Sequence, residues 1–95
     1  MRWRHRRDNN HHALVQMAER LGAYYFPTGP FDGWIWFRGS WKLVEIKNPA
    51  CEGHKDEYTP EQLIIMSKLR ERGVPWTVLR TEDDVYKMLG ARRTA

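Results

Sequence analysis

Residues Phe31–Lys47 read FDGWIWFRGSWKLVEIK, and this stretch predicts a β-hairpin. Its two halves, 31–37 and 41–47, are rich in aromatic and β-branched residues. They are joined by Arg38-Gly39-Ser40, a connection of hairpin length that contains glycine. The stretch also carries an acid at its start and an acid and a base near its end, which a purely structural hairpin does not require.

The pairing of the two predicted strands brings these charges together. Residues two apart on a strand point to the same side, so Glu45 and Lys47 share one face of the sheet. A hairpin closed near Gly39 places Asp32 on the neighbouring strand, nearly opposite Glu45. Two carboxylates therefore come within a few ångströms of each other, with an ammonium group beside them.

Such a pair of carboxylates has a recognisable chemistry. Like charges at short range repel and raise the pKa of one partner, and a divalent cation removes that conflict. Mg²⁺ prefers oxygen ligands and activates both water and phosphoryl oxygens, while Lys47 could stabilise developing negative charge. We therefore expect a site for phosphodiester hydrolysis. The alternative is a surface strand whose Glu45 and Lys47 simply face solvent.

The flanking segments predict helices and further strands. Thr59-Pro60-Glu61-Gln62 has the pattern of a helix start, with threonine as N-cap and proline at the first helical position. Gln62 could close a capping box there. It also lies three and four residues before Ile65 and Met66, on the side of the helix that faces the sheet, so it could stand beside Lys47. The first predicted helix starts at Asp8, with Asp8, Asn9 or Asn10 as N-cap, and buries Leu14, Met17, Ala18 and Leu21. Strands are predicted at 23–26, 31–37, 41–47 and 76–79. The helix from Pro60 to Gly73 has an apolar face at Ile65, Met66 and Leu69, and a last helix, capped by Thr81, buries Val85, Met88 and Leu89.

This order, α-β-β-β-α-β-α, predicts an α/β (α+β) fold. A hairpin followed by a β-α-β crossover requires a mixed sheet with helices packed against it. At 95 residues the chain fits one domain, residues 1–95, with a basic arm at about 1–7 and a basic tail at about 91–95.

Charge and composition bear on the partner and the compartment. The formal net charge of +4 favours a polyanion such as DNA, although basic ends are also common as solvated termini. The single cysteine, Cys51, fits a reducing compartment. No apolar run is long enough to span a bilayer, so we expect a cytoplasmic protein without a membrane partner. The four histidines lack the paired spacing of a zinc site.

Several residues outside the hairpin are candidates for nucleic-acid contact. Basic and aromatic residues interleave at the N-terminus, where Trp3 could stack on a base. Trp34 and Trp36 share the strand face of Asp32. They predict packing beneath a helix or at a subunit interface, with stacking on an unpaired base as the alternative. The predicted nucleic-acid contacts are Arg2, Trp3, Arg4, Arg6 and Arg7, together with His54 and Lys55 from the loop at 48–58.

At this point the motifs resemble those of the PD-(D/E)XK nuclease superfamily. More narrowly, the chain resembles small VRR-NUC-like nucleases and phage or archaeal Holliday-junction-resolvase-like nucleases. The motifs that carry the resemblance are Arg6-Arg7-Asp8 with Asn10-His11, Phe31-Asp32, Glu45-Ile46-Lys47, Tyr58-Thr59-Pro60-Glu61-Gln62, and Thr77-Val78-Leu79 followed by Asp83-Asp84-Val85. They span about residues 6–90 in the expected order. Each motif is short and degenerate, and it is their succession that is specific.

The resemblance implies a restriction-endonuclease-like core and a metal site. Asp32 and Glu45 would bind Mg²⁺, with Mn²⁺ as a substitute, and the carbonyl of Ile46 would be a third ligand. Lys47 would be the catalytic base or a charge stabiliser, and Gln62 would stand beside it. The chain departs from the pattern at Phe31, where the family has proline, and at His11.

His11 occupies the place of a glutamine in the first helix of the family. A histidine can still bind a metal or a metal-bound water, so His11 is retained as a candidate catalytic residue. The function implied is a metal-dependent DNA endonuclease of the kind used in DNA repair and recombination. It would act on Holliday junctions or other branched DNA in a bacterial or phage-infected cytoplasm.

A four-way junction requires two cuts, which would suit a homodimer. The competing interpretation is a non-catalytic nucleic-acid-binding or assembly protein that keeps a nuclease-like fold.

Overall fold

Helices and strands follow one another in the predicted order α-β-β-β-α-β-α. The computed structural model describes residues 10–54 and 57–91. The elements in this part of the chain are α1 (His11–Arg20), β1 (Tyr24–Phe26), β2 (Gly33–Phe37), β3 (Ser40–Ile46), the short 3₁₀ helix η2 (Pro49–Cys51), α2 (Pro60–Glu71), β4 (Thr77–Leu79) and α3 (Glu82–Leu89). The α+β class with a mixed sheet is confirmed. None of the described helices has the length and apolar character needed to cross a membrane.

The four strands form one sheet in the order β1-β2-β3-β4. The first two pairings are antiparallel, and β3 pairs with β4 in parallel across the α2 connection. In the central hairpin Phe37 lies opposite Ser40, so the connection is the two-residue turn Arg38-Gly39, one residue shorter than predicted. Both turn residues have positive φ, 49° and 84°, as two-residue hairpin turns that match the strand twist require.

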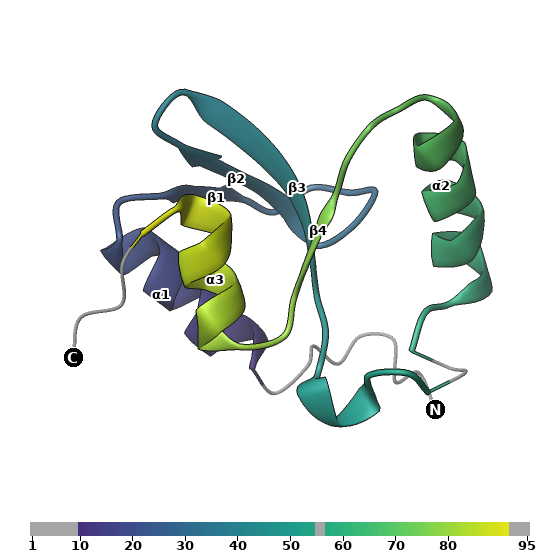
Figure 1. Ribbon diagram of the computed structural model, residues 1–95, viewed down its shortest axis with the longest axis horizontal. Helices are drawn as coiled ribbons and strands as arrows, with labels where there is room; N and C mark the ends of the chain where they lie inside the picture. The colour runs from purple at the N-terminus through teal and green to yellow at the C-terminus, as the bar shows by residue number, and fades with distance from the viewer. Residues whose placement is uncertain (1–9, 55–56, 92–95) are drawn as a thin grey trace.

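One face of this sheet is covered by α1 and α3, which lie side by side (Figure 1). Strand alternation sends every second side chain toward these helices. The core is built where the apolar stripe of each helix meets those side chains. It comprises Leu14, Val15, Met17, Ala18, Ile35, Val44, Ile46, Leu79, Val85 and Leu89. Leu21 and Met88, which were predicted to be buried, pack only partly against it.

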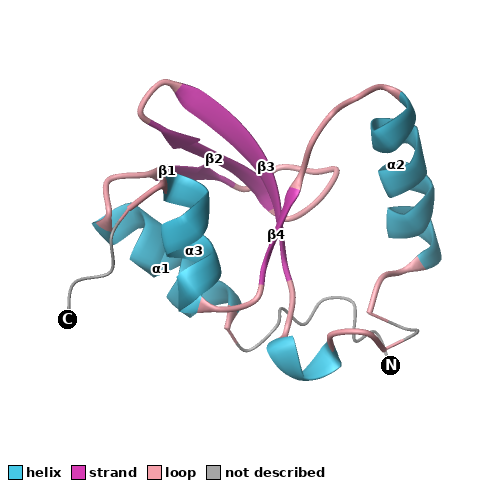
Figure 2. Cartoon of the chain, viewed as in Figure 1, coloured by secondary structure: helices cyan, strands magenta, loops and turns pink. Residues whose placement is uncertain are grey.

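Helix α2 stands apart from that two-helix layer, on the far side of β3 and β4 (Figure 2). None of its residues is buried, and Leu63 and Ile64 are 51% and 57% exposed. Its predicted apolar face, Ile65, Met66 and Leu69, is only half-buried. The spacing of apolar residues predicted this helix face, but it does not determine how much of the face a neighbour covers.

The sheet face away from α1 and α3 carries aromatic side chains at the hairpin end. Trp36 lies opposite Trp41 on β3 and opposite Tyr24 on β1, so these rings share one side of the sheet. Phe26, two residues from Tyr24, joins them. We call these four residues, Tyr24, Phe26, Trp36 and Trp41, the aromatic face; their exposed fractions lie between 38% and 56%.

Candidate functional site

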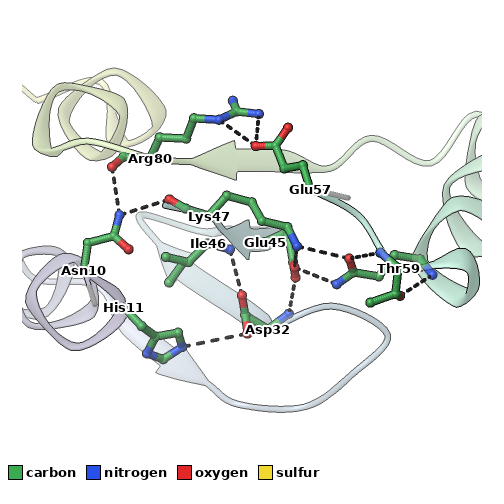
Figure 3. Close-up of polar contacts among 10 residues, drawn as sticks. Asn10, His11, Asp32, Glu45, Ile46, Lys47, Glu57, Thr59 and Arg80 are labelled. Carbon is green, nitrogen blue, oxygen red and sulfur yellow. Dashed lines mark hydrogen bonds and ion pairs between the residues drawn. The ribbon is translucent and has the colours of Figure 1, made fainter. Parts of the chain in front are cut away.

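The hairpin register brings Asp32 and Glu45 together, as the sequence predicts. The backbone N–H of Asp32 donates to a Glu45 carboxylate oxygen, Oε1, at 3.1 Å, and Asp32 Oδ2 accepts from the Ile46 N–H at 2.7 Å (Figure 3). A further bond joins the Asp32 N–H to the Val44 carbonyl. The two carboxylates are therefore held by the backbone of the strands that carry them. Ile46 contributes its backbone here, while its side chain is buried in the core.

Glu45 lies in an environment that opposes its ionisation. The residue is only 4% exposed, and burial together with the nearby charge of Asp32 raises the pKa of Glu45 from 4.5 to about 7. Lys47 and Gln62 act in the opposite direction through charge and hydrogen bonds, but they do not cancel these effects. Near neutral pH, Glu45 therefore holds a proton part of the time.

Lys47 and Gln62 complete the polar cluster around Glu45. The Lys47 ammonium lies 3.1 Å from Glu45 Oε2 and donates to Gln62 Oε1 at 3.1 Å. The Gln62 amide donates to the same Glu45 oxygen at 2.6 Å. The ammonium also lies 4.8 Å from the centre of the Tyr58 ring, which limits its access to water. This arrangement excludes the alternative of a Glu and a Lys that simply face solvent.

Gln62 takes both roles that the sequence left open. Its backbone N–H donates to the Thr59 hydroxyl at 3.1 Å, and its side-chain oxygen accepts from the Thr59 N–H at 3.2 Å. That exchange is a capping box at the start of α2. The same side chain contacts Glu45 and Lys47, so the helix start and the polar cluster share one amide group.

His11 approaches the cluster from the first turn of α1. It is 9% exposed, and its Nε2 lies 3.9 Å from Asp32 Oδ1. The Tyr25 hydroxyl stands between α1 and the hairpin, 3.4 Å from His11 Nε2, and donates to the Asp32 carbonyl at 2.9 Å. His11 therefore borders Asp32 rather than Glu45. Sequence reasoning did not single out Tyr25.

Asn10 was predicted as a possible N-cap, but its side chain makes no capping bond to α1. Instead its amide nitrogen donates to the Lys47 carbonyl at 3.0 Å and to the Arg80 carbonyl at 2.8 Å. It thus joins the ends of the parallel strands β3 and β4 immediately beyond the site. The side chain of Arg80 adds a second contact between distant segments, because its guanidinium donates two hydrogen bonds to Glu57 Oε2, at 3.1 and 2.8 Å. Sequence reasoning missed both contacts.

The predicted nucleic-acid contacts are mostly not located by the structure. Arg2, Trp3, Arg4, Arg6, Arg7 and Lys55 lie outside the described residues. His54 is exposed in the loop that follows η2, near the free thiol of Cys51. The described chain therefore brings Asp32, Glu45, Lys47, Gln62 and His11 together, and it leaves His54 at the surface.

The donor atoms of the cluster restrict which metal could bind. Within residues 10–54 and 57–91, no group of three or more His, Cys, Asp or Glu side chains is arranged to hold a metal ion. The two acidic side chains of the cluster, together with backbone and water oxygens, form a hard donor set. Mg²⁺ typically binds through one or two carboxylates and keeps several waters, so the residues present fit that ion.

Comparison of the chain with protein-family models, with curated proteins and with solved structures finds no match. The functional argument therefore depends on the geometry of the cluster. The Glu45 carboxylate lies within hydrogen-bond distance of the Lys47 ammonium, the Gln62 amide and the backbone N–H of Asp32, and the Asp32 carboxylate accepts from the next backbone N–H of β3, that of Ile46.

Proposed function

We propose that this chain is a metal-dependent DNA endonuclease that hydrolyses phosphodiester bonds. The observation that carries the proposal is the linked set of Asp32, Glu45, Lys47 and Gln62. Two like charges brought together on paired strands, with the pKa of Glu45 raised to about 7, oppose ionisation and need a counter-charge. Strongly perturbed groups of this kind concentrate at functional sites.

Asp32 and Glu45 would hold Mg²⁺, and the Ile46 carbonyl would be a third ligand. Mn²⁺ would substitute for it. When bound, such an ion lowers the pKa of water and polarises a phosphoryl oxygen. The chain itself keeps the two carboxylates in register, because backbone N–H groups fix one oxygen of each. Burial of Glu45 also keeps bulk water away from one side of the site.

Lys47 and Gln62 would act on the phosphate and its attacking water. The ammonium lies on the same strand face as Glu45, so a phosphate bound at the carboxylates would meet its positive charge. Gln62 positions that ammonium through its side-chain oxygen. His11, next to Asp32, would contact a metal-bound water or orient the aspartate.

The substrate that we propose is branched DNA, such as a Holliday junction, or another structured duplex. The net charge of +4 favours a polyanion, and none of the helices and strands in residues 10–54 and 57–91 resembles a base-reading helix or finger. Structure-selective cleavage is therefore more consistent with the chain than sequence-specific cleavage. A homodimer would place two sites on the two strands that a junction requires to be cut.

The test is cleavage of a four-way junction, a flap, a duplex and a single strand of matched sequence. Each is incubated with Mg²⁺, with Mn²⁺, or with EDTA. We expect metal-dependent cleavage that falls about 100-fold or more in Asp32→Asn and Glu45→Gln. Glu71→Gln is the control, because the Glu71 side chain is 74% exposed and lies at the far end of α2. No cleavage of any substrate, or equal cleavage by the site variants, would refute the proposal.

A second candidate is a non-catalytic nucleic-acid-binding or assembly protein on a nuclease-like fold. One observation favours it: Lys47 and Gln62 already bond the Glu45 carboxylate, so those contacts link α2 to the sheet without an ion. In that case the cluster would join α2 to the sheet. Binding without turnover, unchanged by Glu45→Gln and weakened steeply by salt, would support this candidate over the nuclease.

A further inference from the structure

The aromatic face and the polar cluster lie on the same side of the sheet. On β3, Trp41, Leu43 and Glu45 alternate along one face, and the register places Trp36 and Trp34 opposite the first two. Trp41 and Glu45 are four residues apart, which is about 13 Å along a strand. That distance equals about four stacked nucleotides, at about 3.4 Å for each.

A cleft continues the aromatic face toward the site. Its volume is about 180 Å³, and its walls include Trp34, Trp41 and Trp76, with Leu43 beneath them. The guanidinium of Arg70, from α2, lies 5.5 Å from the centre of the Trp76 ring. Exposed rings, a tryptophan-lined cleft and the two carboxylates therefore follow one another along β3.

The rings of the aromatic face are positioned by one another. Trp41 contacts all three others, with ring centres 5.4 Å from Trp36, 6.5 Å from Tyr24 and 6.4 Å from Phe26. Tyr24 and Phe26 are nearly parallel, at an interplanar angle of 21°. Mutual packing restricts the rotamers of these side chains, so a ligand that stacks on them would lose little additional side-chain entropy.

The charge of this surface identifies the class of ligand. Among the residues of the aromatic face and of the cleft lining, Lys42 is the one charged residue, and it is positive. The guanidinium of Arg70 adds a second cation beside the cleft, at the Trp76 ring. Aromatic rings interleaved with cations are the features by which proteins hold single-stranded nucleic acid.

The size of the surface favours a strand of nucleic acid over a second protein chain. An aromatic side chain has an area of about 150–250 Å². Multiplied by the exposed fractions of the four rings, this gives a total of about 400 Å² in contact with water. A stable protein interface of standard size needs about 800 Å² from each partner. Four rings do, however, match a few stacked bases.

We propose that the aromatic face and its cleft bind an unpaired strand of DNA, whose bases stack on the rings while its backbone leads to Asp32 and Glu45. This inference rests on the proposed function, and it narrows the substrate to branched DNA that carries a single-stranded arm. The strand would run along β3, with Arg70 contacting its phosphates.

The experiment measures binding in EDTA, so that cleavage does not interfere. The probes are a fluorescein-labelled oligothymidylate of about 15 nucleotides, near the upper length that one small binding domain covers, and a blunt duplex of mixed sequence. We expect the oligothymidylate to bind more tightly and to quench tryptophan fluorescence. Trp41→Ala should weaken it by about 5- to 150-fold, as expected for the loss of one stacked base.

Two further variants separate stacking from a general effect on the protein. Trp41→Phe keeps a ring and should retain most of the affinity. Ile64→Ala is the control, because Ile64 is an exposed apolar residue on α2 and lies outside the aromatic face. Equal binding of duplex and oligothymidylate, or unchanged affinity in Trp41→Ala, would overturn the inference. So would a Trp41→Ala variant that changes oligomeric state in sedimentation without changing affinity.

The same variants distinguish this inference from the proposed function. Stacking that depends on Trp41, in a protein that cleaves no substrate, would refute the nuclease while supporting the strand-binding surface. Metal-dependent cleavage that is equally efficient in Trp41→Ala, with unchanged KM on a single-stranded arm, would support the nuclease and overturn the surface.

Discussion

Replacing Glu45 by glutamine should change how the stability of the protein depends on pH. The folded state raises the pKa of Glu45 from 4.5 to about 7, so between these values it binds a proton that the unfolded chain has released. The free energy of unfolding decreases with rising pH wherever the folded state binds more protons than the unfolded state. The contribution of Glu45 is therefore fully favourable below pH 4.5 and is lost as the pH rises to about 7.

The size of this effect on stability follows from the difference between the pKa of Glu45 in the folded and in the unfolded state. Each unit of pKa difference is equivalent to about 1.36 kcal/mol, so a pKa of Glu45 raised from 4.5 to about 7 corresponds to about 3 kcal/mol. Glutamine cannot ionise and lacks this dependence. Between about pH 4.5 and 8, the free energy of unfolding of Glu45→Gln should rise by about 3 kcal/mol relative to that of the parent. Altered contacts with Lys47 in Glu45→Gln would lower its free energy of unfolding by the same amount at both pH values, so they would not change this difference.

Urea denaturation followed by tryptophan fluorescence, in EDTA and at several pH values, measures this difference. Glu71→Gln is the matched control, and its stability should remain parallel to that of the parent because the Glu71 side chain is 74% exposed. If Glu45→Gln is also parallel to the parent, burial and Asp32 do not hold a proton on Glu45. If the parent instead gains stability with rising pH relative to Glu45→Gln, the ion pair with Lys47 outweighs burial and the reasoning is refuted.

Further predictions concern single residues and the metal. In Gly33→Ala the new Cβ would lie 2.5 Å from the Phe26 carbonyl oxygen, so we expect a loss of about 1–3 kcal/mol in urea denaturation; an unchanged midpoint would contradict this close packing. Thr59→Ala removes a helix cap and should cost about 1 kcal/mol, and it should also reduce cleavage. Thr81→Ala removes the equivalent cap of α3, whose hydroxyl bonds Asp84 and none of the residues of the cluster, and should cost similar stability with cleavage retained. At about pH 8, Mg²⁺ at about 100 times its dissociation constant should stabilise the parent by about 2.7 kcal/mol in thermal or urea unfolding, and Asp32→Asn should show no such gain.

Local rules predicted the hairpin and its charges because both depend on neighbours in sequence. A turn at Gly39 and a two-residue period are sufficient to place Asp32 opposite Glu45, and the register confirms this pairing by extension from Gly33 and Val44. The start of α2 was equally accessible, since a capping box involves residues only three apart.

Contacts between distant segments could not be read in the same way. Asparagine is a residue type favoured at helix N-caps. The side-chain amide of Asn10 instead donates to carbonyls that lie 37 and 70 residues away in sequence, at the ends of strands that only the folded sheet brings together. The pairing of Arg80 with Glu57 likewise joins two loops. For α2, the apolar period predicted a face, but burial depends on what lies opposite, and Leu63 and Ile64 remain exposed.

The amide of Gln62 has a consequence for local unfolding. Helix α2 has no buried residue, and such elements belong to the part of a protein that opens at the lowest free energy. Because one side chain closes the helix start and contacts Glu45 and Lys47, fraying of the first turn also breaks the hydrogen bonds of Gln62 to the carboxylate and to the ammonium. Amide hydrogen exchange at the start of α2 would thus report the fraction of molecules whose site is assembled.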